Sequence, residues 1–317
     1  MKVSVIMSTY DDADSLTASI ESVLTQDFAD FEFIIVNDGS PDPRTAATLA
    51  RCAGSDPRIR VIAKPNEGLT RALIDGCAVA RGEYLARIDV GDRYLPGRLA
   101  RQVAYLDQHP EVVLVSCAAR FVTVENDFLF ERCGEPDPAK ATATLRHDDV
   151  QCLRGVNGHG STMFRRVAYE GVGGYRWQFY FAQDLDLWMR LTDHGLLAFL
   201  PDVLYEATIA PSGISGRYAR EQRALAELIV RLRQRRAAAE PEGELLGRAA
   251  SIRPATVTEG SWVRRRRLAS GHYFVAQVLR GNGNPRCRRY YRAALGLDPL
   301  HCRAAAAYLV ACLRPRA

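Results

Sequence analysis

The chain lacks a long hydrophobic run. Nowhere in its 317 residues do apolar positions reach the ~18 in succession that a membrane-spanning helix needs. The apolar segment at residues 304–313 is shorter than that and is predicted to be a packed helix. The apolar start of the chain is also short, and Asp11, Asp12 and Asp14 follow it at once. We therefore expect neither a transmembrane segment nor a secretion signal.

Cysteine pairs with metal-binding or redox spacing are missing as well. The chain has eight cysteines, but no two of them form a Cys-x-x-Cys pair. In a chain of this length, scattered cysteines predict reduced, mostly buried thiols and a cytosolic compartment. The cysteines stand at positions 52, 77, 117, 133, 152, 287, 302 and 312.

Two nucleotide-binding signatures are absent after the first predicted strand, residues 2–8. No Gly-x-Gly-x-x-Gly follows it, which argues against a dinucleotide-binding domain. No loop rich in glycine and arginine follows it either, which disfavours a nucleotidyltransferase.

Acidic residues are scarce in the last third of the chain. Residues 217–317 carry 21 Lys and Arg against 7 Asp and Glu, whereas residues 1–216 carry 21 against 30. A basic segment of this size indicates an anionic partner such as lipid headgroups, a phosphorylated acceptor or nucleic acid. The alternative is that these arginines cover solvated helix faces. Nucleic acid is disfavoured because no recognition motif accompanies the charge.

Strands and helices alternate through the first ninety residues. The strands are rich in Val and Ile, as expected of strands buried on both faces. This alternation predicts an α/β fold with a mostly parallel sheet and crossover helices. The predicted strands are residues 2–8, 31–36, 59–62 and 84–88, and the predicted helices are a stripe from Leu16 to Leu24 capped by Asp14, then 45–52 and 69–80.

The second half of the chain is less regular. Its predicted strands are 112–115, 119–124, 128–132 as a hairpin partner of the second, 161–164 and 199–205; residues 134–155 are predicted to be irregular and 184–194 helical. We expect an α/β domain at 1–210, a long basic helix at 211–236, a linker at 237–261 and a helical extension at 262–317.

Two carboxylates follow the fourth predicted strand. Asp89 and Asp92 stand directly after the apolar run, and Pro96 opens the next predicted helix. Ligands of open α/β sheets bind beyond the carboxyl ends of the strands. Acidic groups at that place suit a divalent cation, a ribose or both. The segment therefore predicts a site for a phosphorylated nucleotide.

Several motifs in a fixed order resemble the family 2 glycosyltransferases, which are inverting enzymes with the GT-A fold. The resemblance covers residues 1–210 and is specific for the family but not for the sugar. The motifs are VIMSTY at 5–10, VNDGS at 36–40, NEGLTRAL at 66–73, ARIDVGD at 86–92, MFRR at 163–166 and QDLDLW at 183–188.

The resemblance implies a nucleotide site. Thr9 and Tyr10 would contact the nucleotide, and Asp38 would accept the N3–H of uracil or thymine, which favours a UDP- or dTDP-sugar donor. Arg71 would pair with phosphate, because its guanidinium is always charged, and Asp89 would contact the ribose or the cation. The alternatives are that Asp38 only forms a turn and that Arg71 is an exposed helix charge.

The resemblance also implies a general base. Asp184, preceded by Gln183, matches the catalytic motif and would remove the proton from the attacking acceptor hydroxyl. Asp184 begins a predicted helix, whose dipole favours the ionised form; its alternative role is a helix cap. His159 would touch the diphosphate or the acceptor; its alternative role is a satisfied structural side chain. Gln183 and Trp188 would lie near the diphosphate or the acceptor. Asp186, Arg165 and Arg166 are predicted to be structural.

One position departs from the family pattern. Relatives carry Asp-x-Asp-Asp where this chain has Asp89-Val90-Gly91-Asp92, so the acid expected to bind Mg²⁺ or Mn²⁺ is a glycine. Such a cation would neutralise the leaving diphosphate. Asp89 or Asp92 would hold the ion instead, or arginines and a helix end would carry the diphosphate without metal. A third outcome is a catalytically weak scaffold that binds nucleotide-sugars.

The C-terminal region suggests a site of association. Residues 290–299 resemble half of a tetratricopeptide-type repeat, whose partner helix would be 268–279. Trp262 followed by four arginines at 264–267 suits an anionic membrane surface. We therefore expect a cytoplasmic enzyme, peripheral to the inner face of the membrane, with a glycan or lipid-linked acceptor.

Overall fold

The computed structural model describes residues 1–211, 217–254 and 260–313. The chain divides into two compact units. The sheet unit comprises residues 1–119, 132–207 and 221–253, and the helical unit comprises 120–131, 208–220 and 254–317. The predicted α/β domain is thus interrupted at 120–131, and the basic helix from residue 221 belongs with it.

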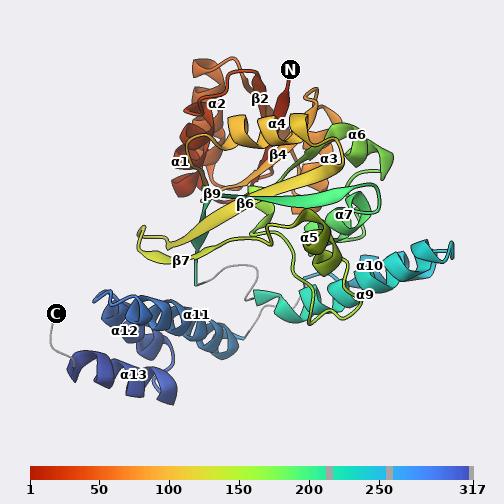
Figure 1. The fold of residues 1–317 in the computed structure, drawn as a ribbon. Helices are drawn as coiled ribbons and strands as arrows, with labels where there is room; N and C mark the ends of the chain where they lie inside the picture. Colours follow the sequence, from red (N-terminus) through yellow and green to blue (C-terminus); the bar gives the residue numbers. More distant parts are fainter. Residues whose placement is uncertain (212–216, 255–259, 314–317) are drawn as a thin grey trace. The chain divides into compact units, whose positions relative to one another are not determined.

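The parallel half of the sheet forms as the sequence predicts. Strand β1 (Val3–Thr9) lies between β2 (Phe31–Asp38) and β4 (Tyr84–Asp89), and β3 (Ile59–Lys64) extends the sheet beyond β2. All three pairings are parallel. Figure 1 shows these strands with their helices α1 (Ala13–Leu24), α2 (Pro43–Ser55) and α3 (Leu69–Ala78).

The strand register gathers the predicted nucleotide residues at one edge. Thr9 is paired with Asn37, and Ser8 is paired with Asp89, so β1, β2 and β4 end together. Both faces of these strands are buried, which explains why most of their residues are apolar. The polar exceptions before the strand ends are Ser4, Glu32 and Arg87, and all three are buried.

The second half of the sheet is antiparallel. The full strand order is β3-β2-β1-β4-β8-β6-β9-β5, and β7 pairs with β6. The hairpin prediction is confirmed, but the two strands predicted at 112–115 and 119–124 are one continuous strand. These elements are β5 (Arg93–Tyr94), β6 (Val112–Thr123), β7 (Phe128–Arg132), β8 (Met163–Arg165) and β9 (Leu196–Ile209).

Three local predictions are wrong. Asp14 does not cap α1; it lies in the first turn and pairs with Arg44. A helix, α5 (Pro138–Leu145), lies in the segment predicted to be irregular, and the Asp137 carboxylate caps it by accepting from the Ala139 amide. The thiols are free but not mostly buried, because only Cys77, Cys117 and Cys287 are buried. The remaining helices of this half are α4 (Arg98–Gln108), α6 (Arg166–Gly171) and α7 (Gln183–Leu191), with a 3-10 turn at His159–Ser161.

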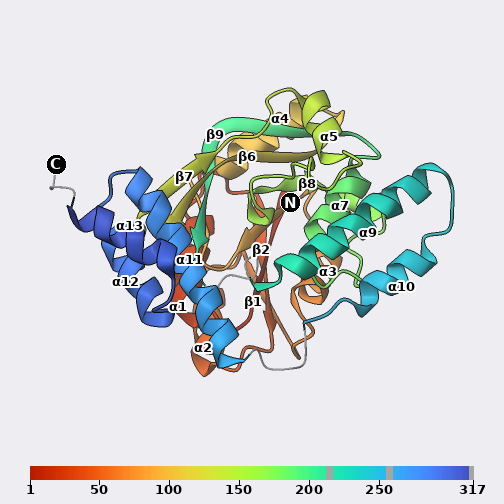
Figure 2. The same ribbon diagram turned by 90° about the horizontal axis from the view of Figure 1, so that it is seen from below.

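The predicted linker contains a helix. After α9 (Ala219–Ala237), the chain forms α10 (Gly243–Ser251), and both belong to the sheet unit. Figure 2 shows α9 beside α7. At least one basic side chain of α9 is therefore used within the sheet unit, because Arg236 pairs with Asp193.

A chain of alternating charges joins α7 to α9 and α10. Arg190 pairs with Asp186 at 2.5 Å, and Arg176 lies 3.7 Å from the other oxygen of Asp186. Arg176 also pairs with Glu242 at 2.6 Å, and Glu242 pairs with Arg236 at 2.7 Å. Buried or half-buried charges are stable only when paired, so this chain fixes α7 against the two later helices.

Arg236, the last member of this series of ion pairs, makes a second contact near the other end of α7. Arg236 also pairs with Asp193, two residues after α7, at 2.7 Å, and Asp193 pairs with Arg146 at 3.0 Å. Both ends of α7 are thus tied to α9 by ion pairs.

The helical unit packs three helices on the tip of a hairpin. These helices are α11 (Ser261–Gly281), α12 (Cys287–Leu297) and α13 (Cys302–Leu313). Leu129 of β7 belongs to their core together with Leu279 and Tyr291. Asn282 donates to the Leu129 carbonyl at 2.7 Å, and Arg286 pairs with Asp127 at 2.9 Å.

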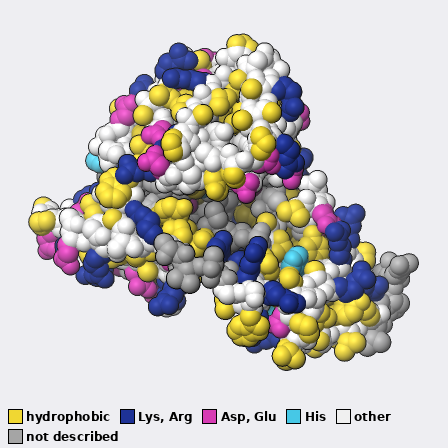
Figure 3. Space-filling model, turned by 180° about the vertical axis from the view of Figure 1, so that it is seen from behind, with side chains coloured by type: hydrophobic (Ala, Val, Ile, Leu, Met, Phe, Trp, Pro, Cys, Tyr) yellow, Lys and Arg dark blue, Asp and Glu magenta, His cyan; other side chains and the backbone are white. Residues whose placement is uncertain are grey.

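The arginine run of α11 is used inside the helical unit. Arg265 donates to the carbonyls of Gly296 and Leu297 at the end of α12, and Arg266 lies 3.5 Å from Asp298 and stacks on Trp262. Arginine at a helix end satisfies carbonyls that lack an intrahelical partner. Part of the run predicted to face a membrane therefore caps α12. On the face drawn in Figure 3, basic side chains are dispersed among hydrophobic and acidic ones.

Across the described ranges, no helix has the length and apolar character needed to cross a bilayer.

Glu242→Gln tests the charge chain. The variant leaves Arg176 and Arg236 without their shared carboxylate, and we expect a loss of about 1–3 kcal/mol in the free energy of unfolding. This loss lowers the melting temperature by several degrees, as measured by thermal unfolding. Glu240→Gln is the matched control, because Glu240 is exposed and lies 3.9 Å from Arg235. Equal melting temperatures for the two variants would contradict the role of Glu242 as the carboxylate that Arg176 and Arg236 share.

Candidate active site

The loop after β4 is held in place by helix α1. The Ser19 hydroxyl donates to the Asp92 carbonyl at 2.8 Å and accepts from the Gly91 amide at 2.9 Å. Gly91 has φ +93°, a conformation that side chains rarely adopt. The glycine that departs from the family pattern therefore also sets the path of this loop.

Both acids of the loop have partners within the protein. Asp89 forms an ion pair with Arg87, two residues earlier in β4. The Tyr205 hydroxyl of β9 donates to Asp92 at 2.5 Å and lies 3.5 Å from the Asp89 amide. The sequence reasoning missed both partners. An arginine inside an apolar strand was a usable signal for Arg87, but no local pattern marked Tyr205.

Arg87 is the buried positive charge of the site. Its side chain is almost fully buried, and its Nε atom has no hydrogen-bond partner in the described part of the chain. For His159, the charge of the guanidinium adds to burial in lowering the pKa. For Asp184, it opposes burial, which raises the pKa. A buried guanidinium is never neutral, so its positive charge acts on both of these groups.

Asp184 lies in the first turn of α7, close enough to Asp89 for the two charges to interact. Burial raises the pKa of Asp184, and repulsion from Asp89 raises it further. The Leu185 amide, which donates to the Asp184 carboxylate at 2.8 Å, and the charge of Arg87 act in the opposite direction. The two acids, ninety-five residues apart in the sequence, thus share one electrostatic environment.

His159 is buried and neutral. Its Nε2 atom lies 2.7 Å from the Tyr175 hydroxyl, and its ring meets the Trp188 ring edge-to-face at 6.0 Å. Burial lowers the pKa of His159 well below its ordinary value, and the charge of Arg87 lowers it further. The imidazole therefore brings no positive charge to a diphosphate at neutral pH.

Gln183 and Trp188 are both buried on α7. Trp188 belongs to the hydrophobic core of the sheet unit, and no described residue accepts from its indole nitrogen. The structure therefore gives Trp188 a packing role beside His159. The contacts of Gln183 and Trp188 with the acceptor or the diphosphate stay predictions.

Asp38 and Thr9 lie at the edge where the strands end. The Asp38 carboxylate accepts from the amides of Glu67 and Gly68, at 3.1 Å and 2.8 Å, and so holds the β3–α3 loop. The Thr9 hydroxyl is buried and has no partner among the residues that the structure describes. A buried hydroxyl without a partner costs free energy, so this edge is suited to a polar ligand.

Tyr10 and Arg71 are exposed. Tyr10 follows β1, and Arg71 lies in the first turn of α3 with its guanidinium stacked over the Trp177 ring at 5.0 Å. Their nucleotide contacts stay predictions.

The structural roles predicted for three other residues agree with the contacts. Arg165 donates to the carbonyls of Val112, Leu106 and His109. Arg166 donates to the Gly82 carbonyl and pairs with Glu170. Asp186 belongs to the charge chain of α7.

The donor set does not fit a cation held by protein side chains alone. In the described ranges, no three His, Cys, Asp or Glu side chains are grouped as metal ligands. Asp89 is paired with Arg87, Asp92 accepts from Tyr205, and Gly91 supplies no ligand. No catalytic step is therefore assigned to a metal ion.

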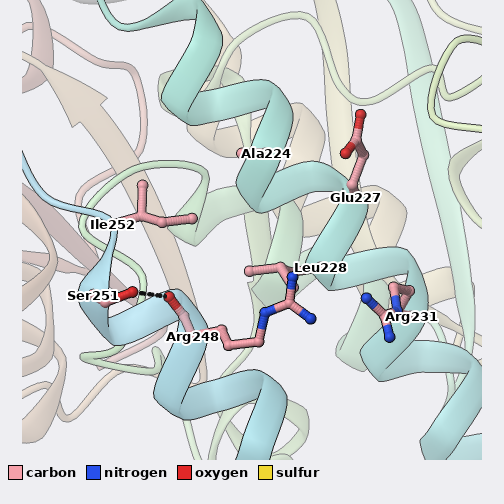
Figure 4. A pocket seen from close by; sticks show the side chains of 7 residues that line it. All are labelled: Ala224, Glu227, Leu228, Arg231, Arg248, Ser251 and Ile252. Atoms are coloured by element: carbon pink, nitrogen blue, oxygen red, sulfur yellow. Dashed lines mark hydrogen bonds between the residues drawn. The ribbon is translucent and has the colours of Figure 1, made fainter.

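A pocket of about 260 Å³ lies elsewhere, between α9 and α10 (Figure 4). Leu228 and Ile252 line it together with Arg231 and Arg248. Its volume is below the ~300 Å³ of typical ligand sites, and it contains none of the predicted site residues.

The sequence profile described as "Glycosyl transferase family 2" matches residues 4–173, more than half of the chain. The chain therefore belongs to glycosyl transferase family 2. It is 31% identical over 209 residues to EpsE of Bacillus subtilis, covering 65% of this chain and 72% of EpsE. It is also 31% identical over 206 residues to the amylovoran biosynthesis glycosyltransferase AmsE of Erwinia amylovora, covering 63% of this chain and 74% of AmsE.

Solved structures show the same fold. A crystal structure of residues 1–349 of S. aureus TarS aligns with a TM-score of 0.58 at 16% identity, over 98% of this chain and 89% of that chain. A TarS structure in complex with UDP-GlcNAc aligns with a TM-score of 0.54 at 15% identity, with the same coverage. The predicted GT-A fold with added C-terminal helices is confirmed.

Gly160→Ala tests the packing of Tyr205. A Cβ atom at Gly160 would overlap the Tyr205 hydroxyl, so we expect Tyr205 to be displaced from Asp92. Overpacking of this kind costs about 1–3 kcal/mol, measurable as a lower denaturation midpoint. Gly171→Ala is the control, since nothing lies within 4 Å of a Cβ atom there. Adding Tyr205→Leu to Gly160→Ala should restore part of the loss; unchanged stability in Gly160→Ala would exclude the contact.

Proposed function

We propose that this protein is an inverting glycosyltransferase with Asp184 as its general base. The observation that supports the proposal is the electrostatic coupling of Asp184 to Asp89. Asp184 lies in the first turn of α7, and Asp89 ends β4; the resemblance implies an acceptor role for the first and a donor role for the second. Arg87 pairs with Asp89, and its charge opposes the effect of burial, which raises the pKa of Asp184.

In the proposed reaction, the acceptor hydroxyl attacks the anomeric carbon of the donor sugar. The Asp184 carboxylate takes the proton of that hydroxyl as the new glycosidic bond forms, and the nucleoside diphosphate leaves from the opposite face. A base must be ionised to act. The Leu185 amide and Arg87 offset the burial that disfavours the ionised form of Asp184.

We propose a UDP- or dTDP-sugar as the donor. TarS, which has a similar fold, has been crystallised in complex with UDP and with UDP-GlcNAc. Asp38 remains the candidate for the base N3–H, using the lone pairs that the Glu67 and Gly68 amides leave open. The unpartnered hydroxyl of Thr9 lies at the same edge.

We propose a glycan or a lipid-linked glycan as the acceptor, in polysaccharide biosynthesis. The name of AmsE assigns it to amylovoran biosynthesis, which supports this class. Peripheral association with an anionic membrane on its cytoplasmic side is part of the proposal. The exposed Trp262 and Val263 at the start of α11 are the candidate contacts, with Arg264 beside them.

A nucleotide-sugar-binding scaffold with little turnover is the alternative. Gly91 favours it, because the acid expected to bind a cation is absent and its φ of +93° strains any replacement. The retained Asp184 favours an enzyme.

Asp184→Asn separates the two functions. If Asp184 is the base, transfer should fall by about 10²-fold or more, while UDP affinity stays within twofold of the parent. Transfer would be measured as UDP release with a panel of glycan acceptors, and affinity by calorimetry. Full transfer by the variant would refute the assigned base.

The melting temperature of Asp184→Asn serves as its folding control. Folding raises the pKa of Asp184, so the ionised carboxylate opposes folding at neutral pH and a neutral amide does not. We therefore expect the variant to be as stable as the parent or more stable. A lower melting temperature would show that lost activity reflects damage to the fold.

A cation requirement is tested by a nucleotide panel. UDP, dTDP and GDP would each be added with and without Mn²⁺, and the melting temperature measured. Because Asp89 and Asp92 already have partners, we expect a shift for UDP or dTDP that Mn²⁺ increases little. A UDP affinity at least tenfold higher with Mn²⁺ would show that Asp89 or Asp92 does hold the ion with the diphosphate.

A further inference from the structure

Two arginines and an exposed tryptophan meet beside the segment that leads to Asp184. Arg71 of α3 stacks over the Trp177 ring with its guanidinium 5.0 Å from the ring centre. Arg253, just after α10, donates to the carbonyls of Gln178 and Trp177 at 3.1 Å and 3.4 Å. Trp177 is 46% exposed, so its ring is accessible to a ligand.

The charges of this cluster are not neutralised by nearby acids. Throughout the described ranges, no carboxylate pairs with Arg71 or Arg253. Burial lowers the pKa of Arg253, and repulsion from Arg71 lowers it further, so the two guanidinium groups lie within electrostatic range. Like charges held together without an acid attract an anion.

The cluster is attached to the segment that precedes the proposed base. The Thr70 hydroxyl donates to the Phe179 carbonyl at 2.6 Å and ties α3 to the segment. A Cβ atom at Gly68 would lie 2.7 Å from the Tyr180 ring. The ring therefore packs against Gly68 in space that any larger residue would occupy. Trp177 precedes Asp184 by seven residues. A ligand on Trp177 therefore lies on the same segment as the group that must touch the acceptor hydroxyl.

We propose that Arg71, Trp177 and Arg253 form an acceptor subsite for a negatively charged glycan unit, one that carries a phosphate or a carboxylate. The guanidinium groups would pair with the anion, as arginine does with both groups, and the indole would pack against the sugar ring. This inference rests on the proposed function and names the class of its acceptor.

The cluster favours the acceptor over the donor diphosphate. The donor residues Thr9, Asp38 and Asp89 lie at the ends of β1, β2 and β4. Trp177 and the carbonyls that hold Arg253 belong instead to the segment before α7. This reassigns Arg71 from the predicted nucleotide contact to the acceptor side.

The test measures binding of defined probes to the full chain. The probes are a glycerol-phosphate oligomer, an oligogalacturonate and the neutral sugar maltotriose, each with saturating UDP. Saturation-transfer NMR would report binding, with dissociation constants from competition. We expect the phosphate or the carboxylate probe, or both, to bind at least tenfold more tightly than maltotriose, and the difference to shrink with salt. The ranking of the two charged probes identifies the anion.

Variants locate the binding. Arg71→Gln, Arg253→Gln and Trp177→Leu should each weaken the charged probes at least fivefold, while UDP affinity in the absence of probe stays within twofold. Arg51→Gln, an exposed arginine on α2, is the matched control and should change neither.

Three results would overturn the proposal. The first is equal binding of charged and neutral probes, or no binding of either. The second is charged-probe binding that Arg71→Gln and Arg253→Gln leave intact. The third is a loss of UDP affinity in these variants, which would return Arg71 to the donor side. Failure of the proposed function itself is recognised separately, by the absence of UDP binding in the parent or by full transfer in Asp184→Asn.

Discussion

The ion pair between Arg87 and Asp89 is the interaction on which the active site depends. A guanidinium inside a sheet must keep a carboxylate near it, because an unpaired buried charge is strongly destabilising. Arg87 therefore fixes Asp89 at the end of β4. The same charge opposes the effect of burial, which raises the pKa of Asp184, and it adds to the effect of burial in lowering the pKa of His159. One buried cation thus acts on side chains from three separate segments of the chain.

The helices after the sheet are tied by ion pairs to α7, which carries the proposed base. Asp186, two residues after the proposed base, is held by Arg190 and Arg176. Arg176 in turn depends on Glu242 at the start of α10. The basic helix α9 that follows the catalytic motifs is therefore part of the scaffold of the site. The aromatic and cationic cluster around Trp177 lies on the same segment, between this scaffold and the base.

Local patterns predicted the first half of the fold and failed where packing decides. The strands ending at Thr9, Asp38 and Asp89 were predicted from mostly apolar runs, which are typical of a sheet covered on both faces. Helices α5 and α10 are short, with eight and nine residues, and Pro and Glu residues precede both, so no long apolar stripe marked either of them. Tyr205 reaches the site from a strand more than a hundred residues after Asp92, and no spacing rule predicts such a contact.

The sequence by itself determined the family, the parallel half of the sheet, and the acids at positions 89 and 184, because motif order and hydrophobic alternation are local properties of the chain. Tertiary structure alone decided which partner each acid has. It paired Asp89 with Arg87 and Asp92 with Tyr205, and it placed Arg236 of α9 in an ion pair and Arg265 of α11 at a helix end. The physical reason is that charge interactions depend on distance and burial, which are fixed only when separate segments pack together.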